Sequence, residues 1–288
     1  SLRELVEDLN ADRVKVLIIN GTNPVYTAPA DLDFAEALAK AGTTIHLSRH
    51  IDETGRLCEW HLPESHPIES WGDVRGHDGA TTIIQPTIAP LYVGTTTIIE
   101  LLSRMTDEEP RSGYDIVQGF WKERFGSGDF NAFWRNALAE GLIPDEQAWD
   151  AVVRPKAQPF TAFTPAEASD IEVVFQPDST VLDGAFANNA WMQELPKPLT
   201  KICWDNAVFM AYADATAQDL KNEDLVEVTV NGRTVKGAVW IQPGHARGCI
   251  TLHLGYGRWA AGKVGDGMGF NAYTVRTSAA LSFAGGAS

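Results

Sequence analysis

The chain contains 288 residues, 44% of them hydrophobic, so the length favours two domains and the composition is sufficient for real cores. A formal net charge of -15 opposes direct binding to nucleic acid or to an anionic membrane surface. It favours binding to another protein that has a basic docking surface. Apolar runs such as Val16 to Ile19 are far shorter than the ~20 residues of a membrane-spanning helix, so no direct membrane insertion is predicted.

The first half of the chain is predicted to begin with a βαβ unit. Val14 to Ile19 is a short β-branched run that predicts a buried strand almost at the start, followed by a turn at Asn20-Gly21. A single helix is expected between Pro29 and Gly42, because Pro favours the first turn of a helix and Gly its end. A second strand, Thr43 to Leu47, completes the unit and indicates a parallel sheet covered by helices.

The segment after this unit has fewer regular patterns. Pro63 to Tyr92 contains many turn-forming residues, which predicts a long irregular excursion with short strands that include Thr81 to Ile84. Helices are expected from Thr95 to Met105 and from Phe130 to Ala139. Arg154 to Pro165 holds three prolines and few large aliphatic residues, which predicts an interdomain linker.

The second half of the chain changes to strands. Asn231-Gly232 between two of them is a strong signal for a type I′ hairpin, because both residue types tolerate positive φ. One short helix, Thr216 to Lys221, is expected after Asp214 as its N-cap. The expected strands are Ile171 to Phe175, Leu225 to Val230, Thr234 to Ile241 and Ile250 to Leu254.

The cysteines and one histidine-rich segment bear on metal binding. Cys58, Cys203 and Cys249 lie too far apart in the chain for a CxxC spacing and are predicted to be ordinary buried thiols. His61 to Asp78 carries eight ionisable side chains in eighteen positions, which suits a divalent metal or proton transfer. Because its spacing matches no metal signature and two prolines interrupt it, an ordered, salt-bridged loop at a domain or subunit interface is favoured.

The Gly-rich tail is the most informative stretch. Six glycines lie from Gly255 to Gly269, and such a backbone presents several N–H groups together, which suits phosphates or a flat heterocycle. The alternative is that these glycines turn tight corners in a small barrel. Arg258 is placed to bind a phosphate bidentately, or else to stack at the surface on Trp259. Asn23 follows the first strand, where it would either meet a ligand or cap its own turn.

Two parts of the chain resemble the molybdopterin oxidoreductases of the dimethyl sulfoxide reductase type. The run VKVLIINGTNP and the later Glu53-Thr54, Cys58 to Pro63 and Glu69 to Gly72 resemble, in order, motifs of the third domain of that family. The C-terminal part is similar to its molybdopterin-dinucleotide-binding domain, with the Asp205-Asn206 turn and the tail from Gly255 to Tyr273 in sequence. Segments such as SHPIESWGDVRGHDG and DGAFANNAWMQELPKPLTK resemble more closely the molybdopterin-oxidoreductase-like iron–sulfur subunit of alternative complex III, a bacterial respiratory assembly.

The resemblance implies an α/β Rossmann-like domain over residues 1–155 and a β-rich, six-stranded double-psi β-barrel over residues 166–288. It implies the C-terminal piece of an electron-transfer subunit that acts as scaffold and docking body, inactive by itself and without its own redox centre. Iron–sulfur clusters would lie on segments absent from this sequence, which begins with Ser1 rather than Met. The implied partners are other subunits of a membrane-associated respiratory complex, on the periplasmic or cytoplasmic face of a bacterial membrane.

An alternative implied by the same family is binding of a Mo- or W-bis(molybdopterin guanine dinucleotide). The sequence departs from the cofactor-bearing members, since His77 to Ala80 lacks the Arg of their Asn-x-Glu-Gly-Arg element and Cys58-Glu59 replaces their Ala-Asp pair. A third alternative is a self-sufficient hydrolase or metal enzyme that uses the histidine-rich segment. The cofactor-binding residues of the second alternative would be Asn23, Asp205, Asn206, Gly255, Gly257, Arg258 and Asn271.

Overall fold

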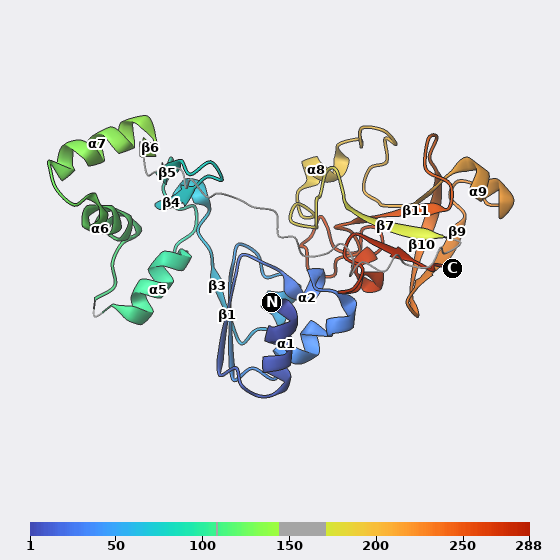
Figure 1. The fold of residues 1–288 in the computed structure, drawn as a ribbon, viewed down its shortest axis with the longest axis horizontal. Helices are drawn as coiled ribbons and strands as arrows, with labels where there is room; N and C mark the ends of the chain where they lie inside the picture. Colours follow the sequence, from blue (N-terminus) through green and yellow to red (C-terminus); the bar gives the residue numbers. More distant parts are fainter. Residues whose placement is uncertain (108, 144–170) are drawn as a thin grey trace, which may run out of the picture.

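The computed structural model describes residues 1–107, 109–143 and 171–288 (Figure 1). These ranges contain a three-stranded sheet near the N-terminus, a second small sheet with neighbouring helices, and a six-stranded sheet in the C-terminal part. No helix within them is both long and apolar enough to cross a bilayer. The linker predicted at Arg154 to Pro165 lies outside the described residues, and so does the boundary between the predicted domains 1–155 and 166–288.

The N-terminal sheet is parallel, as the βαβ pattern predicts. β1 (Val16–Asn20) pairs with β2 (Thr43–Ser48), and β2 pairs with β3 (Trp60–Pro63), in the order β1-β2-β3. Helices cover one face of this sheet and form a core with its apolar side chains. The buried residues of that core are Val6, Leu9, Ile19, Phe34, Ala37 and Leu38.

Two secondary-structure predictions in this region are wrong. The chain does not begin almost at once with a strand, because α1 (Leu2–Asn10) precedes β1 and Ser1 forms a capping box with Glu4. The single helix expected between Pro29 and Gly42 is broken, because Asp33 has a φ of 44°, a left-handed conformation that an α-helix cannot continue through. The pieces between β1 and β2 are α2 (Pro24–Thr27), η1 (Ala30–Leu32) and α3 (Phe34–Leu38).

Residues 66–107 and 109–143 form a helical arm that stands apart from the other two parts in Figure 1. Its strand β5 has the bounds that the sequence predicts, and its last helix begins after Asp129, whose side chain accepts a hydrogen bond from Ala132 N. Indole and aliphatic side chains form the core of the arm, with Trp121 and Trp134 buried. The elements are η2 (Pro67–Glu69), β4 (Gly72–Arg75), β5 (Thr81–Ile84), α5 (Ile98–Thr106), α6 (Gly113–Phe125), α7 (Phe130–Glu140) and β6 (Leu142–Ile143).

The C-terminal part is built on a curled, half-barrel sheet of six strands in the order β12-β7-β11-β8-β10-β9. β7 pairs with β11 and β8 with β10 in parallel, whereas the other neighbours are antiparallel. The curled sheet encloses an apolar core in which Val173 and Leu252 are fully buried. The elements are β7 (Glu172–Pro177), α8 (Ala190–Glu194), β8 (Val208–Met210), α9 (Tyr212–Ala217), β9 (Leu225–Val230), β10 (Arg233–Ile241), β11 (Cys249–Leu254), η4 (Ala272–Val275) and β12 (Phe283–Gly285).

The hairpin predicted at Asn231-Gly232 is confirmed. These residues have φ values of 49° and 76° and connect the antiparallel strands β9 and β10. The short helix is displaced, because α9 begins at Tyr212 and Asp214 lies inside it rather than at its N-cap. The Asp214 carboxylate instead accepts a hydrogen bond from Gly248 N at 2.8 Å. The described fold therefore combines helices with separate sheets, one of them a curled half-barrel.

Candidate functional site

A cavity of about 220 Å³ lies between the carboxyl ends of the parallel strands and the C-terminal part. Gly21 follows β1, Ser48 ends β2 and Glu64 follows β3, so one edge of the sheet brings together residues that are distant in sequence. The C-terminal part contributes a short loop and one arginine. The lining residues are Gly21, Thr22, Asn23, Tyr26, Thr27, Ser48, Arg49, His50, Asp52, Glu64, Asp183, Gly184, Ala185 and Arg258.

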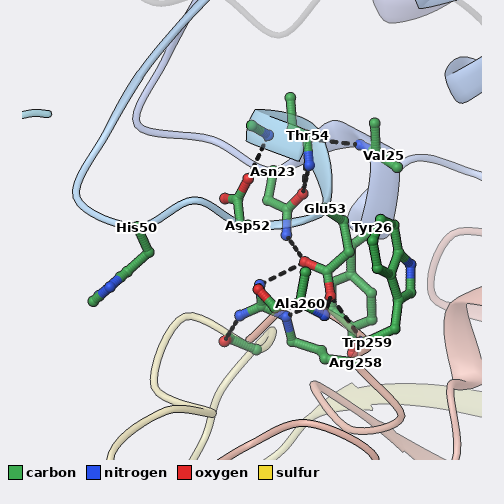
Figure 2. A network of polar contacts seen from close by, with 12 residues as sticks. Asn23, Val25, Tyr26, His50, Asp52, Glu53, Thr54, Arg258, Trp259 and Ala260 are labelled. Atoms are coloured by element: carbon green, nitrogen blue, oxygen red, sulfur yellow. Dashed lines mark hydrogen bonds and ion pairs between the residues drawn. The ribbon is translucent and has the colours of Figure 1, made fainter. Parts of the chain in front are cut away.

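Glu53 is the centre of a polar network beside this cavity (Figure 2). It is the first residue of α4 (Glu53–Leu57), whose N-cap Asp52 accepts a hydrogen bond from Gly55 N at 2.9 Å. Arg258 donates from Nη2 to Glu53 Oε2 at 2.6 Å and from Nε to Oε1 at 3.2 Å. The side chain of Glu53 is 0% exposed and that of Arg258 is 9% exposed. A buried, bidentate ion pair therefore joins the N-terminal and C-terminal parts.

Further hydrogen bonds surround this pair. The backbone N–H groups of Trp259 and Ala260 donate to Glu53 Oε1 at 3.1 and 3.0 Å, and Asn23 Nδ2 donates to Oε2 at 2.7 Å. Arg258 Nη1 donates to Gly184 O at 2.8 Å. These contacts compensate the cost of removing two charges from water.

Asn23 connects the turn after β1 with the start of α4. Its Oδ1 accepts hydrogen bonds from Thr54 N at 3.2 Å and from Thr54 Oγ1 at 2.7 Å. Thr54 Oγ1 in turn accepts one from Val25 N at 3.1 Å. The prediction that Asn23 caps its own turn is wrong, since its side chain makes no cap hydrogen bond at α2. Its amide instead donates to Glu53 and accepts from Thr54 at the same time, as Figure 2 shows.

The ionisation of Glu53 is linked to stability. Burial by itself would raise the pKa of this carboxyl, but the hydrogen bond and positive charge of Arg258, with the Asn23 amide, lower it from 4.5 to about 2. Because the folded-state pKa is depressed, the stabilisation is complete above the unfolded value of 4.5 and is lost as the pH falls toward about 2.

We therefore expect acid to remove a stability difference between the wild-type protein and Glu53→Gln. Denaturant unfolding of both proteins at about pH 6 and about pH 3 measures this difference, which should be smaller at the lower pH because wild-type Glu53 then starts to take up a proton on unfolding. A difference that stays the same at both pH values would contradict the linkage.

Two further ionisable side chains of the cavity lining, Glu64 and His50, have shifted pKa values. Partial burial raises the pKa of Glu64, and the nearby charge of Arg49 opposes that shift. Partial burial also lowers the pKa of His50, and the positive charges of Arg49 and Arg258 lower it further.

His46 lies next to Ser48 and Asp52 of the cavity lining, but the three do not form a nucleophilic triad. Ser48 Oγ and Asp52 Oδ1 both face His46 Nδ1, at 3.3 and 3.6 Å, while His46 Nε2 lies 2.9 Å from Thr22 O. Ser48 Oγ also donates to His50 O at 2.6 Å. A triad requires the Ser and the Asp on opposite ring nitrogens, so His46 and Asp52 do not form one with Ser48, whose Oγ also lies 3.3 Å from His61 Nε2.

Of the seven predicted cofactor-binding residues, Asn23 and Arg258 line the cavity. The alternative that Arg258 stacks at the surface on Trp259 is wrong, because Arg258 is buried at 8% exposure and lies over the Tyr26 ring, 5.3 Å from its centroid. The cation above the Trp259 ring is Arg56, at 6.0 Å. Arg258 is thus an internal residue of the contact between the two parts.

The other predicted residues make contacts within the C-terminal part. Asn206 Nδ2 donates to His253 O and Phe270 O, at 2.9 and 3.0 Å, and Asp205 Oδ1 accepts from Asn206 N at 2.8 Å. Asn271 is the N-cap of η4. None of these five residues, which include Gly255 and Gly257, lines the cavity described above. Cofactor binding by this set stays a prediction.

Gly255 and Gly257 lie against neighbouring backbone. Their φ values are 101° and 68°. A Cβ atom on Gly257 would lie 2.1 Å from Asn271 N, and one on Gly255 would lie 2.6 Å from Leu182 O. Both positions therefore require glycine, because the neighbouring backbone is close and φ is positive. This agrees with the alternative that these glycines turn tight corners.

The sequence analysis considered a divalent metal site in the segment from His61 to Asp78. Within residues 1–107, 109–143 and 171–288, no group of three or more His, Cys, Asp or Glu side chains is placed to hold a metal ion. The segment from His61 to Asp78 runs through β3, η2 and β4, and Asp73 accepts a hydrogen bond from Trp121 Nε1 at 2.8 Å. Its role at an interface stays a prediction. Each cysteine is free and only partly buried, which corrects the expectation of buried thiols.

The sequence patterns did not identify several residues of the site. Glu53 stood out only through the Glu-Thr pair of the resemblance, and nothing in the local sequence marks Tyr26 or His50. Asp52 had a usable signal, because an Asp three residues before Gly55 fits an N-cap that begins a helix. Tyr26 shows why such contacts are hard to foresee, since its hydroxyl donates to Tyr256 O at 2.6 Å across 230 positions.

Comparison with known proteins supports the fold. No protein-family model and no curated protein matches the sequence. Among solved structures, the chain is similar to acetylene hydratase from Pelobacter acetylenicus, a member of the dimethyl sulfoxide reductase family, with a TM-score of 0.68 and 12% identity. The match covers 94% of this chain and 42% of that chain, so this chain spans less than half of its length. The likeness supports a distant molybdopterin-oxidoreductase-like fold, whereas the link to alternative complex III stays a prediction.

Proposed function

We propose that this chain is the C-terminal part of a molybdopterin-oxidoreductase-like subunit and acts as a scaffold and docking body, without a redox centre of its own. In this proposal residues 1–155 form a Rossmann-like domain and residues 166–288 a double-psi β-barrel. Its partners are the other subunits of a respiratory electron-transfer complex. The similarity to acetylene hydratase supports the family of the fold, and the net charge of -15 favours a protein partner with a basic surface.

The observation that carries the proposal is the buried pair between Glu53 and Arg258. A pyrophosphate needs cationic or N–H donors that are free to reach it. Arg258 is the one cation among the seven predicted ligand residues, and its charge is already neutralised by Glu53 at 2.6 Å. The ionised Glu53 would in turn repel a phosphate. Arg258 is therefore unsuited to a dinucleotide pyrophosphate, which leaves Arg49 as the other arginine in the lining of the cavity.

Binding of the pterin cofactor remains the competing function because Asn23 and Arg258 do lie at one cavity. That cavity, at about 220 Å³, is smaller than the roughly 300–1,000 Å³ of typical small-molecule sites. Binding would also require Arg258 to leave Glu53 buried and unpaired, at a cost of about 3–5 kcal/mol. Both considerations favour the scaffold.

Metal and pterin analysis of the full-length protein, purified from its native host, tests the proposal. We expect molybdenum and tungsten far below one atom per chain and no stoichiometric pterin, because Arg258 is already paired with Glu53. Stoichiometric molybdenum or tungsten with a pterin dinucleotide would overturn the scaffold role. A family member known to contain the cofactor, purified in the same way, serves as the control for cofactor loss.

A further inference from the structure

A second buried ion pair lies inside the C-terminal part. Lys197 Nζ and Asp178 Oδ2 are 3.5 Å apart, and the side chain of Lys197 is 8% exposed and that of Asp178 is 0% exposed. Asp178 directly follows β7, and Lys197 lies between α8 and β8. Neither residue lines the cavity beside Glu53. Two further charges are thus removed from water outside the candidate site.

The separation is long for a buried pair of opposite charges. Charge-assisted hydrogen bonds between an ammonium group and a carboxylate are about 2.7–2.9 Å long. Asp178 Oδ2 is buried and has no hydrogen-bond partner among the described residues, so the amine at 3.5 Å does not satisfy it. A buried carboxylate oxygen without a hydrogen bond is costly. The pair therefore keeps one unsatisfied oxygen close to an amine nitrogen.

The other oxygen of the same carboxylate accepts three hydrogen bonds. Thr180 N and Thr180 Oγ1 donate to Asp178 Oδ1 at 2.9 and 2.8 Å, and Val181 N donates to it at 3.1 Å. Donors arranged in this way stabilise the negative charge that develops on a carbonyl oxygen when a nucleophile attacks its carbon. Oδ1 is thus held as the oxyanion would be, and Oδ2 is the oxygen that can leave.

The amine is also held in place. Lys197 Nζ donates to Tyr256 Oη at 2.9 Å and to Asp205 O at 3.0 Å. Tyr256 is 1% exposed, and burial raises the pKa of its phenol, so the hydroxyl keeps its proton. It lies near Asp178 because β7 and β11 are parallel and both residues follow the ends of these strands. Reacting atoms in near-attack conformers are about 3–3.5 Å apart, so a small shift of the lysine side chain brings Nζ to the carboxyl carbon.

We propose that Lys197 and Asp178 condense to an intramolecular isopeptide bond. The bond between Nζ and Cγ forms and the bond between Cγ and Oδ2 breaks. Of the three protons of the ammonium group, one stays on the amide nitrogen and two leave with Oδ2 as water, so the step needs no further reactant. The Tyr256 hydroxyl relays these protons. A neutral amide then replaces two buried charges, which removes the cost of keeping them from water.

Cyanogen bromide cleavage of the full-length protein, purified from its native host, tests this proposal. The reagent cuts after Met105, Met192 and Met210, so Asp178 lies in fragment 106–192 and Lys197 in fragment 193–210. We expect these two fragments to stay joined under denaturing conditions, with a mass lower by one water molecule than the sum of the two. Fragmentation in the mass spectrometer should place the link between Lys197 and Asp178.

Three variants of the full-length protein complete the test. Lys197→Leu removes the amine and should release the two fragments, whereas Lys201→Leu removes an exposed lysine of the same fragment and should leave them joined. Tyr256→Phe keeps the ring but removes the hydroxyl, so the link should form at least tenfold more slowly after refolding. An unchanged rate would overturn the relay by Tyr256.

The wild-type mass decides the proposal even where Lys197→Leu does not fold. Wild-type fragments that separate at their full masses would overturn it, and so would a link between other residues or a link that persists in Lys197→Leu. The inference goes beyond the proposed scaffold role and does not depend on it. Molybdenum and pterin content enter none of these readouts, so either proposal can fail without the other.

Discussion

Replacing Arg258 with methionine is expected to lower the free energy of unfolding by about 3–5 kcal/mol, because it leaves Glu53 buried without its countercharge. The carboxylate is 0% exposed, so water cannot replace the two hydrogen bonds at 2.6 and 3.2 Å. Denaturant unfolding monitored by Trp fluorescence measures the loss, since the chain has nine Trp.

Two variants show whether this loss comes from the buried charge. Lys236→Met removes a surface ion pair with Glu227 of nearly equal length, 2.7 Å, between side chains 66% and 59% exposed, and should cost much less than Arg258→Met, because water screens exposed charges. The double variant Glu53→Gln with Arg258→Met removes both charges and should recover at least half of the loss, because no unpaired charge remains. An Arg258→Met protein as stable as Lys236→Met would contradict the role of the pair.

Replacing Gly257 with alanine is expected to destabilise the protein by about 2–5 kcal/mol, which combines left-handed strain of about 1–2 with overpacking of about 1–3 kcal/mol. The new Cβ would lie 2.1 Å from Asn271 N and 2.5 Å from Phe270 C, and these are backbone atoms that no side-chain rotation can move away. The midpoint and slope of denaturant unfolding measure the effect.

Gly267 provides a matched control in the same Gly-rich tail. Its φ of 73° is close to the 68° of Gly257, but a Cβ there would meet nothing within 4 Å. Gly267→Ala should therefore cost only the left-handed strain of about 1–2 kcal/mol. Equal losses in the two variants would show that close backbone approach is not the reason for glycine at position 257.

The elements that were predicted well are those with local signals. The bounds of β5 and β9 match, and the hairpin at Asn231-Gly232 forms, because β-branched runs and the asparagine–glycine turn act over a few residues. The helix between Pro29 and Gly42 failed for the opposite reason. Its apolar positions have a helical period, but the chain turns at Asp33, whose φ of 44° no local pattern indicates.

The candidate site was predicted only in part. Asn23 and Arg258, two of the seven predicted ligand residues, line the same cavity, but the binding partner of Arg258 was expected to be a phosphate or an aromatic ring. It is the carboxylate of Glu53, which lies 205 positions away. A guanidinium binds phosphate and carboxylate with the same geometry, so residue type alone cannot distinguish the two.

The sequence by itself determined the acidic surface, the strand-rich second half and the parallel strands of the first, because these depend on composition and on side-chain alternation along short segments. Only the tertiary structure decided that Arg258 is neutralised, that Gly257 meets neighbouring backbone, and that the Tyr26 hydroxyl donates to Tyr256 O. Each of these three contacts joins segments that are distant in sequence, and only the packing of the folded chain decides which distant segments come into contact.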